Sequence, residues 1–172
     1  HMLNSPNSCA TALMLAHGTG TMPAVNGFVT GLAEAGITEE TAPESYKTQY
    51  ATGIGKIMKD AGYRTVFWYG GMPSWRDIKN YVLAQNFDEC YCASDFKYSG
   101  GNSWGSPDRT LFEQVYQYIE GHPAQKTFHI ILTTTNHPPY TIDVVSEGFD
   151  KKKVLQNLPD DIANDEGIIN EL

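Results

Sequence analysis

Apolar residues along this chain follow two alternating periods, one typical of strands and the other of helices. Three short runs have the length of strands, at 64–69, 89–92 and 128–132, and the first and third are rich in β-branched and aromatic residues. Around them, apolar residues recur at helical spacing. Because helices and strands alternate with short connections, we predict an α/β fold with a mostly parallel sheet and helices on both faces.

Capping residues indicate where the helices begin. Thr21 supplies a hydroxyl cap, with Pro23 in the first turn, for a helix that continues to Leu32. The sequence places the remaining helices at 46–61, from a Ser74 cap, and from Ser106-Pro107-Asp108.

The segment after the third apolar run is the most informative for function. Three threonines and Asn136 lead to His137, which two prolines follow. Proline cannot continue a strand ladder, so His137 is held near the carboxyl end of its strand. Ligands of open α/β sheets bind at such ends, which makes His137 a candidate binding residue. A turn histidine that only ends the strand is the alternative.

Composition narrows the possible partners. The chain has 172 residues, 41% of them hydrophobic, so it can form one buried core. Its formal charge of −8 argues against nucleic acid and against an anionic membrane surface as partners. No apolar run approaches the roughly 18 residues of a membrane-spanning helix.

The cysteines indicate neither a zinc site nor a redox motif. Cys90 and Cys92 lack the two-residue gap of most structural zinc sites, and the third cysteine, Cys9, is far away in sequence. We predict plain burial, because free cysteine behaves mostly as a small hydrophobic residue. We also expect Cys90 and Cys92 to point to opposite faces of their strand.

The two ends of the chain differ from its middle. His1-Met2 has the form of an expression scar, which leaves 3–172 as one partial domain. The tail after Lys151 looks helical but is polar and acidic. It is either a surface helix at a natural terminus or the point where the chain stops inside a larger domain.

Four segments, in this order, resemble one enzyme family. They are Gly18–Thr21, Gly62–Asp77, Asn102–Asp108 and Leu132–Tyr140. Together they are similar to the central part of the lipoteichoic acid synthase and phosphoglycerol transferase family, in the sulfatase-like branch of the alkaline phosphatase superfamily. The resemblance implies the α/β fold of that superfamily, present here in part.

The resemblance also implies roles for individual residues. The family's nucleophile, a threonine after a glycine-rich run, matches Thr21, with Thr19 as the fallback. Trp75 and Arg76 match the pair around the glycerol-phosphate head group, although the family often has one residue between them. His137 matches the substrate-contacting histidine. If these assignments hold, Thr21 and His137 should lie within roughly 10 Å of each other, because both must reach one phosphorus atom.

The family binds a divalent metal, Mn or Mg, and its threonine is a metal ligand. In this chain Thr21 is the only match to that ligand set. The family's acidic ligand before the nucleophile and its later Asp-His pair have no counterpart in the sequence. We therefore expect the longer parent protein to use a metal and this chain alone to bind none tightly, with the remainder of the catalytic domain as its partner.

Two functions remain open at this stage. The first is part of an extracytoplasmic, membrane-anchored enzyme of the bacterial cell envelope that acts on phosphoglycerol or sulfo-ester substrates. The second is a non-catalytic α/β domain that binds an anionic head group or a protein partner.

Overall fold

A computed structural model describes residues 20–32, 46–138, 140, 145, 148–159 and 162. These residues belong to two compact units, 1–137 and 138–172, which are considered separately. The expectation of one partial domain over 3–172 stays a prediction.

The first unit is built on a parallel sheet of three strands in the order β2-β1-β3. Strands β1 (Arg64–Tyr69) and β2 (Glu89–Cys92) have the predicted boundaries, and β3 (Thr127–Leu132) begins one residue early. In the central strand β1, every residue after Arg64 is buried, as its apolar sequence requires.

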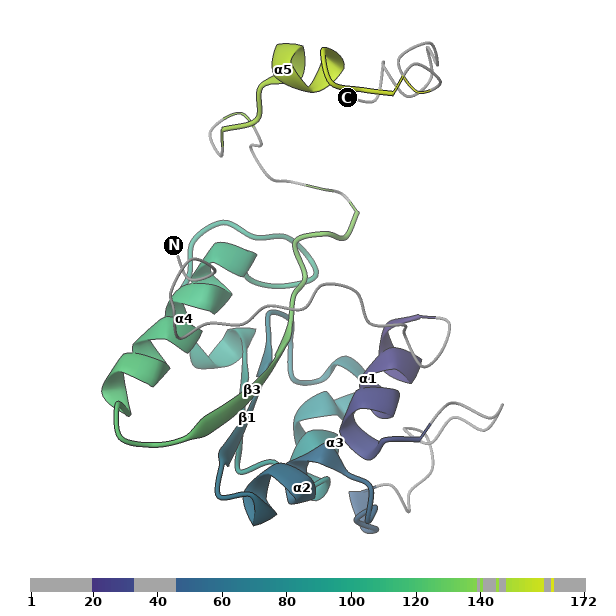
Figure 1. Cartoon of the computed structure of the whole chain (residues 1–172), viewed down its shortest axis with the longest axis vertical. Helices are drawn as coiled ribbons and strands as arrows, with labels where there is room; N and C mark the ends of the chain where they lie inside the picture. Colours follow the sequence, from purple (N-terminus) through teal and green to yellow (C-terminus); the bar gives the residue numbers. More distant parts are fainter. Residues whose placement is uncertain are drawn as a thin grey trace. The chain divides into compact units, whose positions relative to one another are not determined.

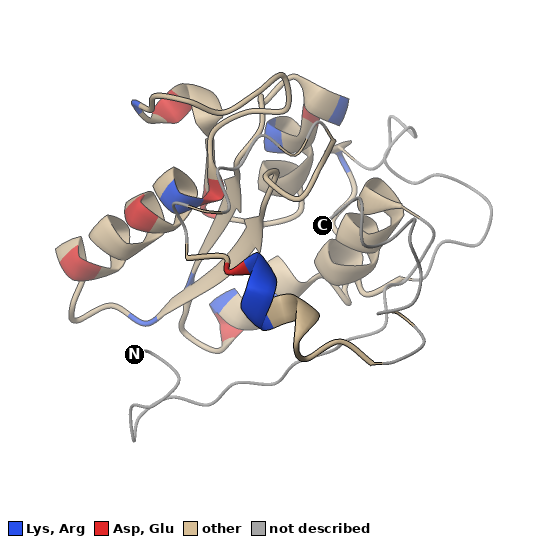
Figure 2. Ribbon diagram, turned by 90° about the horizontal axis from the view of Figure 1, so that it is seen from above, with Lys and Arg blue, Asp and Glu red and all other residues tan. Residues whose placement is uncertain are grey.

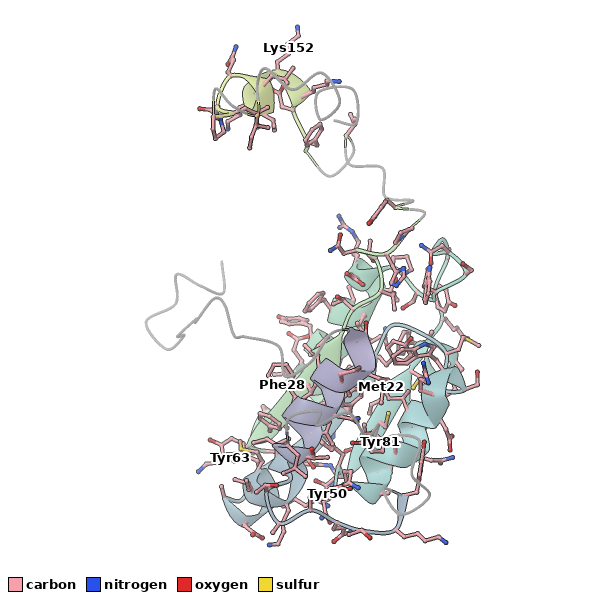
Figure 3. All side chains as sticks on the ribbon, turned by 90° about the vertical axis from the view of Figure 1, so that its right-hand side faces the viewer. Met22, Phe28, Tyr50, Tyr63, Tyr81 and Lys152 are labelled. Atoms are coloured by element: carbon pink, nitrogen blue, oxygen red, sulfur yellow. The ribbon has the colours of Figure 1, made fainter. Side chains whose placement is uncertain are left out.

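Helices cover both faces of this sheet, which confirms the predicted fold class (Figure 1). On one face lie α1 (Thr21–Thr30), α2 (Ile54–Asp60) and α3 (Ile78–Ala84), and on the other lies α4 (Asp108–Gly121). On α1, Met22 is buried against the sheet whereas Phe28 is 39% exposed, and Tyr81 of α3 is fully buried (Figure 3).

Several predicted helix starts were wrong. The cap position of α1 is Gly20, and Thr21 is its first helical residue. Helix α2 begins at Ile54, not at residue 46, and Gly55 in its first turn packs tightly on the carbonyl of Gln85. Ser74 makes no capping hydrogen bond. A short 3-10 turn, η4 (Trp75–Asp77), precedes α3 instead.

The two described cysteines are buried as predicted, but our expectation of opposite faces was wrong. Cys90 and Cys92 both belong to the core between the sheet and α3, with their sulfur atoms 4.0 Å apart. Side chains two positions apart on a strand share a face, since the side-chain period of a strand is two.

An aromatic cluster with one histidine fills the space between the sheet and α4. Trp68 Nε1 donates a hydrogen bond to His129 Nδ1 at 2.9 Å, and the ring of Tyr118 packs edge-on against both. Burial lowers the pKa of His129, although Glu89 opposes the shift. The fold therefore favours the neutral imidazole, which can accept from Trp68.

This histidine makes stability depend on pH. Below about pH 6.5 the unfolded chain takes up a proton at His129 before the folded chain does, so stability is full above that pH and falls as the pH drops toward the lowered pKa. We expect His129→Phe to flatten the slope of unfolding free energy against pH between pH 7 and 5 in urea titrations. His122→Gln, at an exposed histidine that also stacks on Tyr118, is the matched control. An unchanged slope in His129→Phe would contradict this interpretation.

The second unit contains one short helix, α5 (Lys151–Leu155), among its described residues. Asp150 caps it by accepting hydrogen bonds from the backbone N–H groups of Lys152 and Lys153. Figure 2 shows these lysines as a blue segment. Within the described ranges of both units, no helix is long and apolar enough to cross a membrane.

Candidate active site

The carboxyl ends of β1 and β3 lie side by side, because these two strands are parallel neighbours in the sheet. The chain passes from β1 to β2 through α3 on one face, and then crosses to the other side of β1 through α4. Ligands of open α/β sheets bind beyond the carboxyl ends of the strands. The amino end of α1 lies at the same end of the unit as these strand ends (Figure 1).

The segment 102–108 forms hydrogen bonds with the chain just after β1 and with the chain just after β3. Ser106 donates from its backbone N–H to the carbonyl of Gly70, just after β1, at 2.8 Å. The carbonyl of Ser106 accepts from the hydroxyl of Thr134, just after β3, at 3.0 Å. Both Ser106 and Thr134 are buried, so these bonds hold the two strand ends in fixed relative positions.

Asp108, the first residue of α4, fixes the segment that leads to His137. One of its carboxylate oxygens, Oδ1, accepts from the backbone N–H of Thr134 at 2.9 Å and from that of Thr135 at 3.0 Å. The Thr135 hydroxyl in turn accepts from the Asp108 N–H at 2.8 Å. Because the acceptor is charged and has two backbone donors, these hydrogen bonds are strong and hold Thr134 and Thr135 at the start of α4. We call this arrangement the Asp108 clamp. Asp108 is therefore a structural carboxylate at the start of α4.

Gly105 allows this loop to lie directly on the turn after β1. Its φ is +148°, and a Cβ atom there would lie 2.0 Å from the carbonyl oxygen of Gly70. No L-side chain can be accommodated at that distance. The glycine is therefore required by the close approach of two backbones.

We expect Gly105→Ala to destabilise the chain by about 3 kcal/mol or more, because backbone must move to admit the methyl group. Urea unfolding measures this. Gly121→Ala is the control: Gly121 ends α4, and a methyl group added there would meet nothing within 4 Å, so that substitution should stabilise by up to about 1 kcal/mol. Equal stabilities of the two variants would show that loop 102–108 does not pack as described.

His137 is half-buried beyond the clamp, and its ring stacks on Trp104. The ring centroids are 3.6 Å apart with 30° between the planes. His137 Nδ1 is buried and has no hydrogen-bond partner among the described residues. A buried polar atom of this kind calls for a partner that a ligand can supply.

Thr21 is exposed at the first position of α1. With Leu132 at the end of β3, it lines an apolar hollow of about 630 Å³ between α1 and the sheet. The first turn of α1 carries no acidic residue, so the positive end of the helix dipole beside Thr21 is not neutralised by its own helix. Because Gly20 occupies the cap position, the Thr21 hydroxyl is not the helix cap.

Trp75 and Arg76 follow the turn after β1. Trp75 is half-buried against the core, with its ring 5.4 Å from that of Tyr69. Burial raises the pKa of Tyr69 to about 12, so this phenol stays neutral. Arg76 is exposed and has a left-handed backbone, with φ at 52°, and Tyr46 donates a hydrogen bond to its carbonyl at 3.2 Å. Left-handed non-glycine residues cost energy and are frequent at functional sites.

The predicted residues lie on three separate segments: Thr21 opens α1, Trp75 and Arg76 belong to η4, and His137 follows β3. Within the described part of the chain no hydrogen bond or ring contact joins their side chains. The distance expected between Thr21 and His137 stays a prediction. Sequence reasoning interprets Trp104 as a structural residue of its loop with no assigned chemistry, and Thr134 and Thr135 only as part of a threonine run. The Trp-Gly-Ser-Pro-Asp motif was the available signal, but its partners lie in a distant segment.

The described residues do not by themselves fit a divalent metal site. Among them, no group of three His, Cys, Asp or Glu side chains could hold a metal ion. Mn²⁺ requires several oxygen or nitrogen donors, and the Thr21 hydroxyl is one. We expect calorimetric titration of this chain with Mn²⁺ to give no stoichiometric micromolar site. A site of that strength would show that the chain holds ligands which its sequence does not reveal.

Comparisons with known proteins agree with this architecture. One solved structure with a similar fold is a protein in the alkaline phosphatase superfamily from Vibrio parahaemolyticus, 22% identical, with a TM-score of 0.60 over 69% of this chain and 29% of that one. Another is the lipoteichoic acid synthase LtaP from Listeria monocytogenes, 18% identical, with a TM-score of 0.68 over 91% of this chain and 37% of that one. This chain therefore spans well under half the length of either.

The sulfatase family profile matches residues 11–160, which is most of the chain. The matched range includes both strand ends and the loop that joins them. This chain belongs to the sulfatase family.

Proposed function

We propose that this chain is part of the catalytic domain of an enzyme that transfers or hydrolyses phosphate or sulfate esters, with Thr21 as the nucleophile. The observation that carries the proposal is the position of Thr21. Its exposed hydroxyl lies at the unneutralised amino end of α1, at the carboxyl side of the sheet in a sulfatase-family chain. Backbone N–H groups at such a helix end attract anionic esters.

The reaction would proceed by exchange at the phosphorus or sulfur atom. Thr21 Oγ1 forms the new bond to that atom while the ester bond to the leaving alcohol breaks. The hydroxyl proton passes to the departing alcohol. Water or an acceptor alcohol then displaces Thr21 by the same exchange in reverse, which restores the hydroxyl.

Arg76 and His137 would bind the ester head group in this proposal. The guanidinium of Arg76 is exposed on a constrained turn and can donate two parallel hydrogen bonds to an anionic oxygen pair. His137 can donate or accept one through its imidazole. Trp75 offers an apolar wall beside the head group, although much of its ring is packed against Tyr69.

Within this class we propose phosphoglycerol transfer outside the cytoplasm, by a longer membrane-anchored protein that uses Mn or Mg. The four sequence segments and the similarity to a lipoteichoic acid synthase fold support this choice. The bound metal would supply positive charge at the nucleophile, and its remaining ligands would come from parts of that protein other than the described residues.

The test is an assay of the longer protein with Mn²⁺ on three substrates: a phosphoglycerol lipid, an aryl phosphate and an aryl sulfate. We expect glycerol-phosphate release from the lipid to exceed aryl sulfate hydrolysis. Preference for the aryl sulfate would replace the transferase assignment by a sulfatase. No turnover of any substrate, together with saturable binding of glycerol phosphate, would favour a non-catalytic head-group-binding domain. The observation behind that second function is that the described residues contain no group of three His, Cys, Asp or Glu side chains that could hold a metal ion.

A further inference from the structure

We propose that Trp104 is a positioning residue: its indole ring holds the His137 imidazole in the orientation that contacts the substrate. This inference rests on the proposed function, in which His137 binds the ester head group. The two rings lie face to face, with centroids 3.6 Å apart. At that separation the indole covers one face of the imidazole and limits rotation of the ring.

The position of Trp104 is itself fixed by its own loop. Its backbone N–H donates to Asn102 Oδ1 at 2.9 Å. Asn102 and Gly105 exchange backbone hydrogen bonds of 3.2 and 3.1 Å, which close a tight turn around Trp104. Gly105 also forms a bridge to Gly71, just after β1. The backbone that carries the indole is therefore anchored to the end of the central strand.

His137 is anchored from the other side by the Asp108 clamp on Thr134 and Thr135. Asp108 begins α4 directly after the loop that contains Trp104, so one short segment, 102–108, holds both partners of the stack. Trp104 is half-buried and is a member of neither hydrophobic core cluster. A tryptophan that served only the core would pack with one of them.

The buried Nδ1 of His137 explains why the orientation of this ring matters for binding. It has no hydrogen-bond partner among the described residues, an unfavourable state unless something compensates for it. A freely rotating imidazole would turn this nitrogen toward solvent. The indole face opposes that rotation and so keeps Nδ1 in the orientation in which a ligand can bind it.

The first experiment uses this chain and does not depend on activity. Nuclear magnetic resonance of the His137 ring protons should show an upfield ring-current shift. Trp104→Leu should abolish the shift and Trp104→Phe should keep part of it. A His137 spectrum that is the same in wild type and Trp104→Leu would overturn the proposal.

The second experiment is a double-mutant cycle in the longer protein, with turnover of its ester substrate as the readout. Trp104→Leu should raise KM by a factor of about 10 with a smaller change in kcat, and Trp104→Phe should recover most of the loss. In the His137→Ala background, Trp104→Leu should have little further effect, because the residue it positions is absent. Tyr98→Leu, at an exposed aromatic residue, is the control.

The outcomes separate this inference from the function on which it rests. If His137→Ala impairs turnover but Trp104→Leu does not, or if the two effects multiply, Trp104 does not act through His137 and the inference fails alone. If neither Thr21→Ala nor His137→Ala impairs turnover, the proposed function fails and takes the inference with it. Melting temperatures of all variants show whether any loss comes from unfolding.

Discussion

Thr21→Ala is expected to abolish turnover in the longer protein. The substitution removes the oxygen that forms the bond to phosphorus or sulfur, and water in its place would lack the orientation that the start of α1 provides. Losses on removal of a nucleophile are on the order of 10⁴-fold or more. Initial rates on the phosphoglycerol lipid measure the effect.

Thr21→Ser is the matched control, because it keeps a hydroxyl at the same position and should retain measurable activity. Both variants should fold normally: Thr21 is exposed and is not the cap of α1, so its replacement should change stability by no more than about 0.5 kcal/mol. Near-normal turnover in Thr21→Ala would show that the nucleophile has been assigned to the wrong residue, with Thr19 as the next candidate.

Arg76→Ala and His137→Ala are each expected to reduce kcat/KM by a factor on the order of 10 to 10³, the cost of losing a charge-assisted or polar contact to a phosphate. Stability should change little in Arg76→Ala, since that side chain is exposed. Arg76→Lys tests the geometry of the contact: it keeps the charge but loses the planar fork, so its activity should fall between that of wild type and that of Arg76→Ala.

Parallel melting curves decide how these losses are interpreted. A loss of activity with an unchanged melting temperature supports a role in substrate binding. Equal activity in Arg76→Ala and wild type would mean that Arg76 points into solvent in the working enzyme. A loss confined to variants that melt early would make both residues structural.

The strands were predictable because their signals are local. The apolar, β-branched composition of 64–69 and 128–132 is typical of strands in a parallel sheet. The structure buries β1 after Arg64 but leaves β3 half-buried, and β3 ends at Leu132, before the proline pair that follows His137. The alternation of these strands with segments of helical spacing was then enough to predict a parallel sheet with helices on both faces. The structure confirmed that prediction.

Helix starts were less predictable because capping competes with tertiary contacts. Ser74 has the side chain of a cap, yet the chain there turns through two left-handed residues, Arg76 and Asp77, before α3 begins. Burial of Trp75 against Tyr69 accompanies that turn. A hydroxyl cap contributes only about 1 kcal/mol, so packing of an aromatic ring can override it.

By itself, the sequence determined the alternation of elements, the strands and the placement of His137 beyond a carboxyl end, because each depends on residues close together in the chain. The tertiary structure decided the strand order β2-β1-β3, the clamp between Asp108 and the threonines, and the stack of Trp104 on His137. These contacts join segments that are far apart in sequence. They form only when the crossover through α4 brings β3 beside β1, and no local pattern of residues encodes that crossover.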